Sequence, residues 1–172
     1  MAAAAAAAAH TYVVDLQGFK SMNNQFIIKE LCVVSVENDF VLHRIVAPPI
    51  RYQHISPQLR KRVDFITDNI HGLHWDLGCT NETYAIDLLR DILKKATRVY
   101  IKGSERVTYL RRLLNYSVNI VDLDIFDYRG SRELKEYKYS SCSPYLRRHT
   151  ELRCAFRKAY MYRDYLRKHL ER

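Results

Sequence analysis

A single acidic residue inside an apolar run is the first position in this chain that could do chemistry. Asp15 lies in Thr11-Tyr-Val-Val-Asp-Leu-Gln-Gly-Phe19, a run typical of a buried strand. A carboxylate in a buried strand is costly unless a partner compensates its charge. Three explanations stay open: Asp15 binds a metal ion, accepts hydrogen bonds from its neighbours, or is what remains of a former metal site.

The elements that would hold Asp15 in place follow from the spacing of the apolar residues. Five strands are predicted, over residues 11–16, 26–36, 40–46, 98–101 and 117–123. Helices are predicted to start at Ser56-Pro57, Asn81, Gly103-Ser104 and about Thr150. Short polar turns separate the first three strands, which indicates an antiparallel meander. The later strands alternate with helices.

This order of elements predicts a single α/β domain over residues 11–172. Helical crossovers favour parallel strands with right-handed connections, whereas the first three strands pair antiparallel. The expected result is a five-stranded mixed sheet flanked by helices, with the first strand central between the second and the fourth. This is the layout of the ribonuclease-H-like fold. Residues 1–10, with their alanine run, are interpreted as a tag or an unassigned extension that carries no chemistry.

The segment Val14-Asp15-Leu16-Gln17-Gly18-Phe19 resembles the start of a DEDD-type 3′–5′ exonuclease. In that family a first-strand Asp-x-Glu contributes ligands for two Mg²⁺ or Mn²⁺ ions, which stabilise the oxygens of phosphodiester cleavage. Asp15 matches the aspartate, but Gln17 stands in the place of the glutamate. Where the second motif should supply an aspartate, the only acid is Glu105. Asp15 and Glu105 are therefore the catalytic candidates of a degraded site, and magnesium or manganese is implied only for an active nuclease.

A closer resemblance is to the Maelstrom domain of the animal germline small-RNA pathway and to related arthropod proteins. That domain looks like a DEDD fold without its acids, and it carries a Glu–Cys–His–Cys zinc cluster that ties the second strand to the final helix. The matching residues are Glu30, Cys142 and Cys154. The family's histidine position is Tyr145 here, so His149 is the remaining histidine. Tetrahedral zinc accepts such ligands, and the alternative is two buried thiols with His149 facing solvent.

The end of the chain is strongly basic. The formal net charge is +9, and residues 129–172 contain 13 Lys and Arg against 5 Asp and Glu. Tyrosines are interleaved with these cations, a mixture that binds single-stranded nucleic acid through phosphate contacts and base stacking. The alternatives are a solvated helix face and tyrosines that pack in the core. The predicted nucleic-acid contacts are Arg147, Arg148, Arg153, Arg157, Lys158, Arg167, Lys168, Tyr139 and Tyr145.

These features predict a single-stranded RNA- or DNA-binding domain on a catalytically degraded ribonuclease-H-like fold, with a Maelstrom-like part in small-RNA or transposon silencing. The alternatives are an active metal-dependent DEDD nuclease and a self-assembling structural or viral-type nucleoprotein subunit. No apolar run reaches the roughly 20 residues that span a bilayer, so no membrane partner is expected. The scattered spacing of the four cysteines indicates a reducing, intracellular compartment, cytoplasmic or nuclear.

Overall fold

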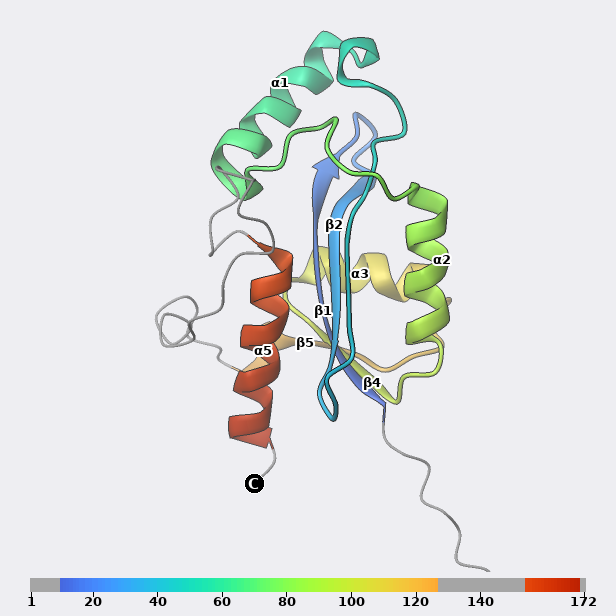
Figure 1. Cartoon of the computed structure of the whole chain (residues 1–172), viewed down its shortest axis with the longest axis vertical. Helices are drawn as coiled ribbons and strands as arrows, with labels where there is room; N and C mark the ends of the chain where they lie inside the picture. The colour runs from blue at the N-terminus through green and yellow to red at the C-terminus, as the bar shows by residue number, and fades with distance from the viewer. Residues whose placement is uncertain (1–9, 127–153, 171–172) are drawn as a thin grey trace, which may run out of the picture.

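The computed structural model describes residues 10–126 and 154–170, which form a five-stranded mixed sheet with helices on both faces (Figure 1). The strands are β1 (Thr11–Lys20), β2 (Phe26–Ser35), β3 (Val41–Ile45), β4 (Arg98–Ile101) and β5 (Ile120–Asp122). They lie in the order β3-β2-β1-β4-β5. The first three pair antiparallel, and β4 and β5 run parallel to β1. The predicted mixed sheet and the central place of the first strand are confirmed.

The helices follow the predicted order. They are α1 (Pro57–Ile66), α2 (Glu82–Leu93), α3 (Ser104–Leu113) and α5 (Ala155–Leu170), with the short segments η1 (Tyr52–His54), η2 (Thr67–His71) and η3 (Leu123–Phe126). In the described part of the chain, no helix is both long and apolar enough to cross a membrane.

Local side-chain chemistry explains where two of the helices begin. The Ser56 hydroxyl accepts a hydrogen bond from the Leu59 N–H at 3.2 Å, and Pro57 occupies the first helical turn of α1. Asn81 caps α2 in the same way, through its side-chain oxygen. A single π-type turn, η2, continues α1 and ends at Gly72, whose φ of 72° is left-handed. The caps at Ser56 and Asn81 agree with the predicted helix starts.

β1 runs four residues beyond its predicted end at residue 16 because a β-bulge lets pairing with β2 continue. The register shifts between Gln17 and Gly18, and β1 reaches Lys20. A Cβ atom on Gly18 would lie 2.0 Å from the Ile27 carbonyl oxygen, so the close approach of the two strands requires glycine. The predicted end of this strand at residue 16 was therefore wrong.

Lys29, which the shifted register skips on β2, is buried in the structure. Its Nζ donates hydrogen bonds to the carbonyl oxygens of Val46 at 3.0 Å and Trp75 at 2.5 Å, and to that of Leu77. These bonds attach the loop after η2 to the sheet. Burial lowers the pKa of Lys29 to about 8, against a smaller opposing effect of Asp76.

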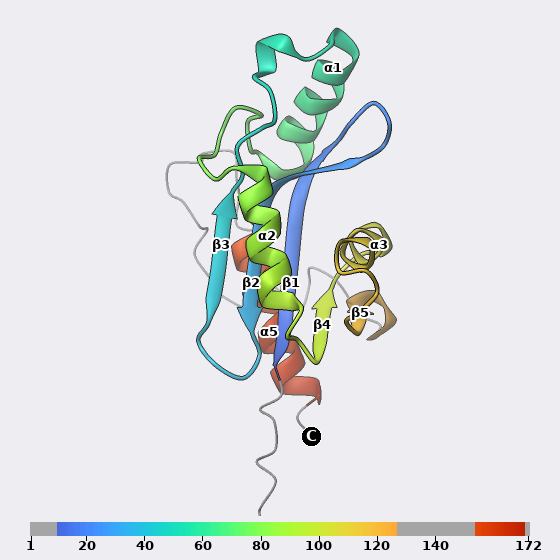
Figure 2. The same ribbon diagram turned by 90° about the vertical axis from the view of Figure 1, so that its right-hand side faces the viewer.

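Each face of the sheet carries its own core, because alternate side chains of a strand point to opposite sides. One core lies under α2 and α3 and includes Val14, Leu16, Leu31, Val33, Leu89 and Leu110. The other lies under α5 and includes Val13, Cys32, Val34, Ala159, Tyr162 and Leu166. Figure 1 shows the sheet between α5 and the pair α2 and α3, and Figure 2 shows α1 beyond the end of β1. Asp15 shares the side of Val13 and therefore faces α5.

Candidate functional site

Polar residues from three adjacent strands meet beneath α5. In the sheet register Asp15 of β1 is opposite Cys32 of β2, which is opposite His43 of β3. One step along the strands, Gln17 is opposite Glu30. Asp15, Gln17, Glu30 and Cys32 are all 2% exposed or less. A group of this kind inside an apolar core must satisfy its own charges and hydrogen bonds.

The Glu30 carboxylate is the centre of the hydrogen bonds in this group. Its Oε2 accepts from the Ala155 backbone N–H at 3.0 Å and from the Gln17 amide at 3.3 Å. Its Oε1 lies 2.9 Å from His43 Nε2, and the Cys154 thiol donates to it at 3.7 Å. Glu30 therefore attaches the second strand to the first residues of α5. The structure brings together Glu30 and Cys154, which the sequence singled out as ligands of one zinc ion.

The remaining zinc candidates, Cys142 and His149, lie outside the described residues. His43 supplies an imidazole at the same place, and sequence analysis missed it, because its register against Cys32 and Glu30 cannot be read from spacing. Within residues 10–126 and 154–170, no group of three or more His, Cys, Asp or Glu side chains is arranged to hold a metal ion. In this part of the chain the Glu30 carboxylate is satisfied by hydrogen bonds.

Asp15 is fully buried, and its two oxygens have no hydrogen-bond partner among the described residues. Two cations compensate its charge from a distance. Arg106 Nη1 of α3 lies 3.8 Å from Oδ1, and Lys158 Nζ of α5 lies 3.7 Å from Oδ2. Burial raises the pKa of Asp15; Lys158 and then Arg106 lower it, whereas Glu30 and Cys154 raise it further.

Glu105 does not join Asp15. It lies in the first turn of α3, where its side chain is half-exposed and pairs with Lys20 Nζ at 2.9 Å. It is absent from the charged groups that act on the pKa of Asp15. The structure therefore does not bring together the two acids proposed as catalytic partners. The next residue, Arg106, contacts Asp15 instead.

The predicted nucleic-acid contacts on the final helix are largely directed inward. Of the four that the structure describes, Arg157 is buried, and Lys158 is paired with Asp15. The Arg167 Nε donates to the Val36 carbonyl oxygen at 2.7 Å, and Lys168 is exposed. Their predicted position off the apolar stripe does not leave all four exposed, because α5 packs more of its circumference against the sheet than that stripe suggested. Outside the described residues lie Arg147, Arg148, Arg153, Tyr139 and Tyr145.

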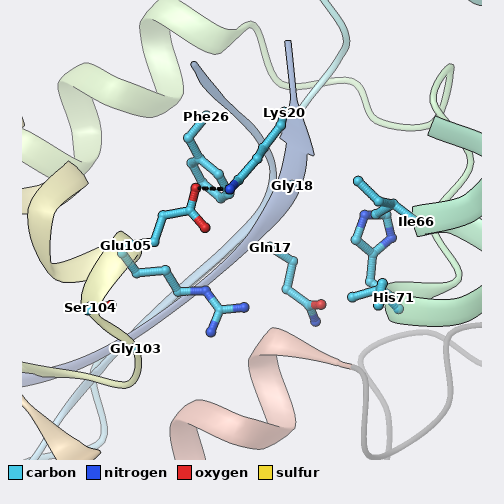
Figure 3. Close-up of a pocket in the computed structure, with 11 residues that line it drawn as sticks. Gln17, Gly18, Lys20, Phe26, Ile66, His71, Gly103, Ser104 and Glu105 are labelled. Atoms are coloured by element: carbon cyan, nitrogen blue, oxygen red, sulfur yellow. Dashed lines mark ion pairs between the residues drawn. The ribbon is translucent and has the colours of Figure 1, made fainter. Parts of the chain in front are cut away.

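A cavity of about 490 Å³ opens where β1 ends, between η2 and the start of α3 (Figure 3). His71 and Ile66 line it on one side and Glu105 on the other, with Gln17 between them, and the ion pair between Lys20 and Glu105 lies at its edge. Arg106, which pairs with Asp15, also lines the cavity. The cavity therefore adjoins the charged group at Asp15.

A second hollow of about 460 Å³ continues the first along α1, since Lys20 and Ile66 line both. Its other lining residues are Asn24, Lys61, Arg62 and Phe65. The Phe65 ring is 62% exposed, and the Arg62 guanidinium is held by the Ser21 carbonyl oxygen at 3.2 Å. We call the two hollows together the basic groove. Its basic lining residues are Lys20, Lys61, Arg62 and Arg106, and Phe65 and Ile66 are part of its apolar lining. No residue of this surface was among the predicted nucleic-acid contacts.

Comparison with known proteins adds no relative: no protein-family model matches the chain, and no curated protein is significantly similar to it.

Proposed function

We propose that this chain is a domain with a ribonuclease-H-like fold that binds single-stranded RNA or DNA. We propose further that it does not cleave the strand it binds. The observation that carries the proposal is the basic groove. Among the described residues, four Lys or Arg side chains and one acid line it, and the acid, Glu105, is already paired with Lys20. An overall charge of +9 adds a long-range attraction for polyanions.

The groove combines the two features that unspecific binding of a single strand requires. Lys61 and Arg62 are exposed on α1 and can follow the phosphates of an extended strand. The exposed Phe65 ring, on the same helix, offers a face on which a base can stack, worth about 1–3 kcal/mol per base. The order of the strands, with β1 between β2 and β4, supports the ribonuclease-H-like assignment.

The loss of catalysis is inferred from the charges around Asp15. A two-metal nuclease needs several carboxylates around its ions. Here the Gln17 amide donates to Glu30, and Glu105 pairs with Lys20. We infer that hydrolysis of a phosphodiester is not supported at this place.

Zinc is proposed as a structural ion, held by Glu30, Cys142, His149 and Cys154. The contact between the Cys154 thiol and the Glu30 carboxylate supports it, as it does the Maelstrom-like relationship and the silencing role that goes with it. Elemental analysis of protein never exposed to a chelator tests the ion. About one zinc per chain, lost in Cys154→Ser, is expected, and a ratio near zero would remove zinc from the proposal.

Fluorescence anisotropy with a labelled single-stranded RNA and the matching DNA, across a salt series, tests the binding. The affinity is expected to fall steeply with salt. The double variant Lys61→Ala/Arg62→Ala should lower the slope by about 1 for each phosphate contact removed. Lys94→Ala/Lys95→Ala removes the same charge at the end of α2 and is the matched control. A salt-independent signal, or equal losses in both double variants, would contradict the proposal.

A further inference from the structure

The Asp15 carboxylate occupies a position that, in the fold proposed above, would hold a divalent ion. It lies on the central strand, is fully buried, and has no hydrogen-bond donor for either oxygen among the described residues. An ionised carboxylate in that state requires a positive charge nearby.

Two side-chain cations supply it, one for each oxygen. Lys158 approaches Oδ2 from α5, on one face of the sheet, and Arg106 approaches Oδ1 from the start of α3, which packs on the other face. Their distances, 3.7 and 3.8 Å, are longer than those of charge-assisted hydrogen bonds. The contacts are therefore electrostatic, and both cations keep part of their surface in water, at 19% and 29% exposure.

The side chains around Asp15 that the structure describes do not fit Mg²⁺ or Mn²⁺. These ions take oxygen ligands, and carboxylates in particular. Among the described residues, Glu30 is the other acid that acts on Asp15, and its oxygens are engaged by the Ala155 N–H, the His43 imidazole and the Gln17 amide. A divalent ion would also have to share the site with two positive side chains, whose repulsion opposes its binding.

We propose that Lys158 and Arg106 together replace the divalent ion, so that the chain itself compensates the charge of Asp15 without metal. The two cations also connect α3 and α5 to the central strand. They would therefore stabilise the fold at the position where a nuclease binds its catalytic ions. This inference concerns Asp15 alone and does not depend on nucleic-acid binding in the basic groove. The two proposals can therefore fail separately.

Mn²⁺ binding tests the first half of the inference. Electron paramagnetic resonance measures free Mn²⁺ as it is added to the wild-type chain and to Asp15→Asn. The two titrations are expected to coincide, because Asp15 offers no site for the ion. Binding in the wild type that Asp15→Asn abolishes would overturn the proposal.

A double-mutant cycle tests the second half, with Lys168→Met, on an exposed face of the same helix, as the control. Lys158→Met keeps the length of the side chain but removes its charge. It should shift the unfolding equilibrium of the wild type about tenfold toward the unfolded state, and should shift that of Asp15→Asn little. Equal shifts in both backgrounds would show that Lys158 only packs against the sheet, and would overturn the proposal.

Discussion

The thiol of Cys154 lies 3.7 Å from the carboxylate of Glu30, although 124 positions separate the two residues in the chain. The contact fixes the start of α5 against the middle of β2. It also brings an acid and a thiol from opposite ends of the sequence into one buried group, together with His43.

Replacing Glu30 by alanine should lower the free energy of unfolding by about 3–5 kcal/mol, because the partners of a buried, hydrogen-bonded charge would be left without an acceptor. Urea denaturation followed by circular dichroism measures the change. Glu105→Ala removes a half-exposed acid and should change stability by less than about 1 kcal/mol. Similar losses in the two variants would show that the Glu30 group is not structural.

Asp15→Asn should stabilise the chain at neutral pH and change it little in acid. Burial raises the pKa of Asp15 in the folded state above its unfolded value of 3.8, despite the nearby Lys158 and Arg106. Below pH 3.8 the carboxyl is protonated in both states and contributes no difference. Above that pH the unfolded state ionises first, so the wild type loses stability as pH rises toward the folded pKa.

Urea midpoints of the wild type and Asp15→Asn at pH 4.5 and pH 7.5 test this, and the advantage of the variant should grow between the two values. Glu30 and Cys154 oppose the ionisation of Asp15. Both residues are present in the wild type and in the variant, so their own titration contributes nearly equally to both stabilities and largely cancels in the difference. A variant advantage that shrinks as pH rises would show that Lys158 and Arg106 outweigh the effect of burial.

Gly18→Ala should destabilise the fold by about 2–4 kcal/mol. Its Cβ would lie 2.0 Å from the Ile27 carbonyl oxygen, so the two central strands would have to separate at the bulge. Thermal or urea unfolding gives the loss, and weaker hydrogen-exchange protection at the ends of β1 and β2 would locate it. A variant as stable as the wild type would mean that the bulge can shift its register.

Phe65→Ala should weaken binding of a single strand by about 1–3 kcal/mol and leave stability nearly unchanged, since the ring is 62% exposed and can stack on a base. Anisotropy at fixed salt measures the affinity. Tyr84→Ala removes an aromatic ring of 58% exposure from α2, outside the groove, and is the matched control. Equal affinities of the two variants would place the ligand elsewhere.

Much of the fold could be predicted from local patterns. Apolar alternation, the proline after Ser56 and the cap at Asn81 marked strands and helices, and the order of elements implied the mixed sheet around β1. The end of β1 could not be predicted in this way, because Gln17 to Lys20 resemble a turn and only pairing with β2 keeps them extended. The contact of His43 with Glu30 could not be predicted either, because it depends on the register of β3 against β2.

The sequence by itself determined which residues could do chemistry: an aspartate in an apolar strand, the amide of Gln17 two residues after it, and a glutamate and a cysteine proposed as zinc ligands. Only the tertiary structure decided how their charges are compensated. Arg106 and Lys158 come from helices on opposite faces of the sheet and meet at Asp15, whereas three of the four described basic residues predicted to bind nucleic acid on α5 turn inward. Electrostatic pairing depends on distances of a few ångströms between segments far apart in the chain, and these distances are set by the packing of α3 and α5 on the sheet.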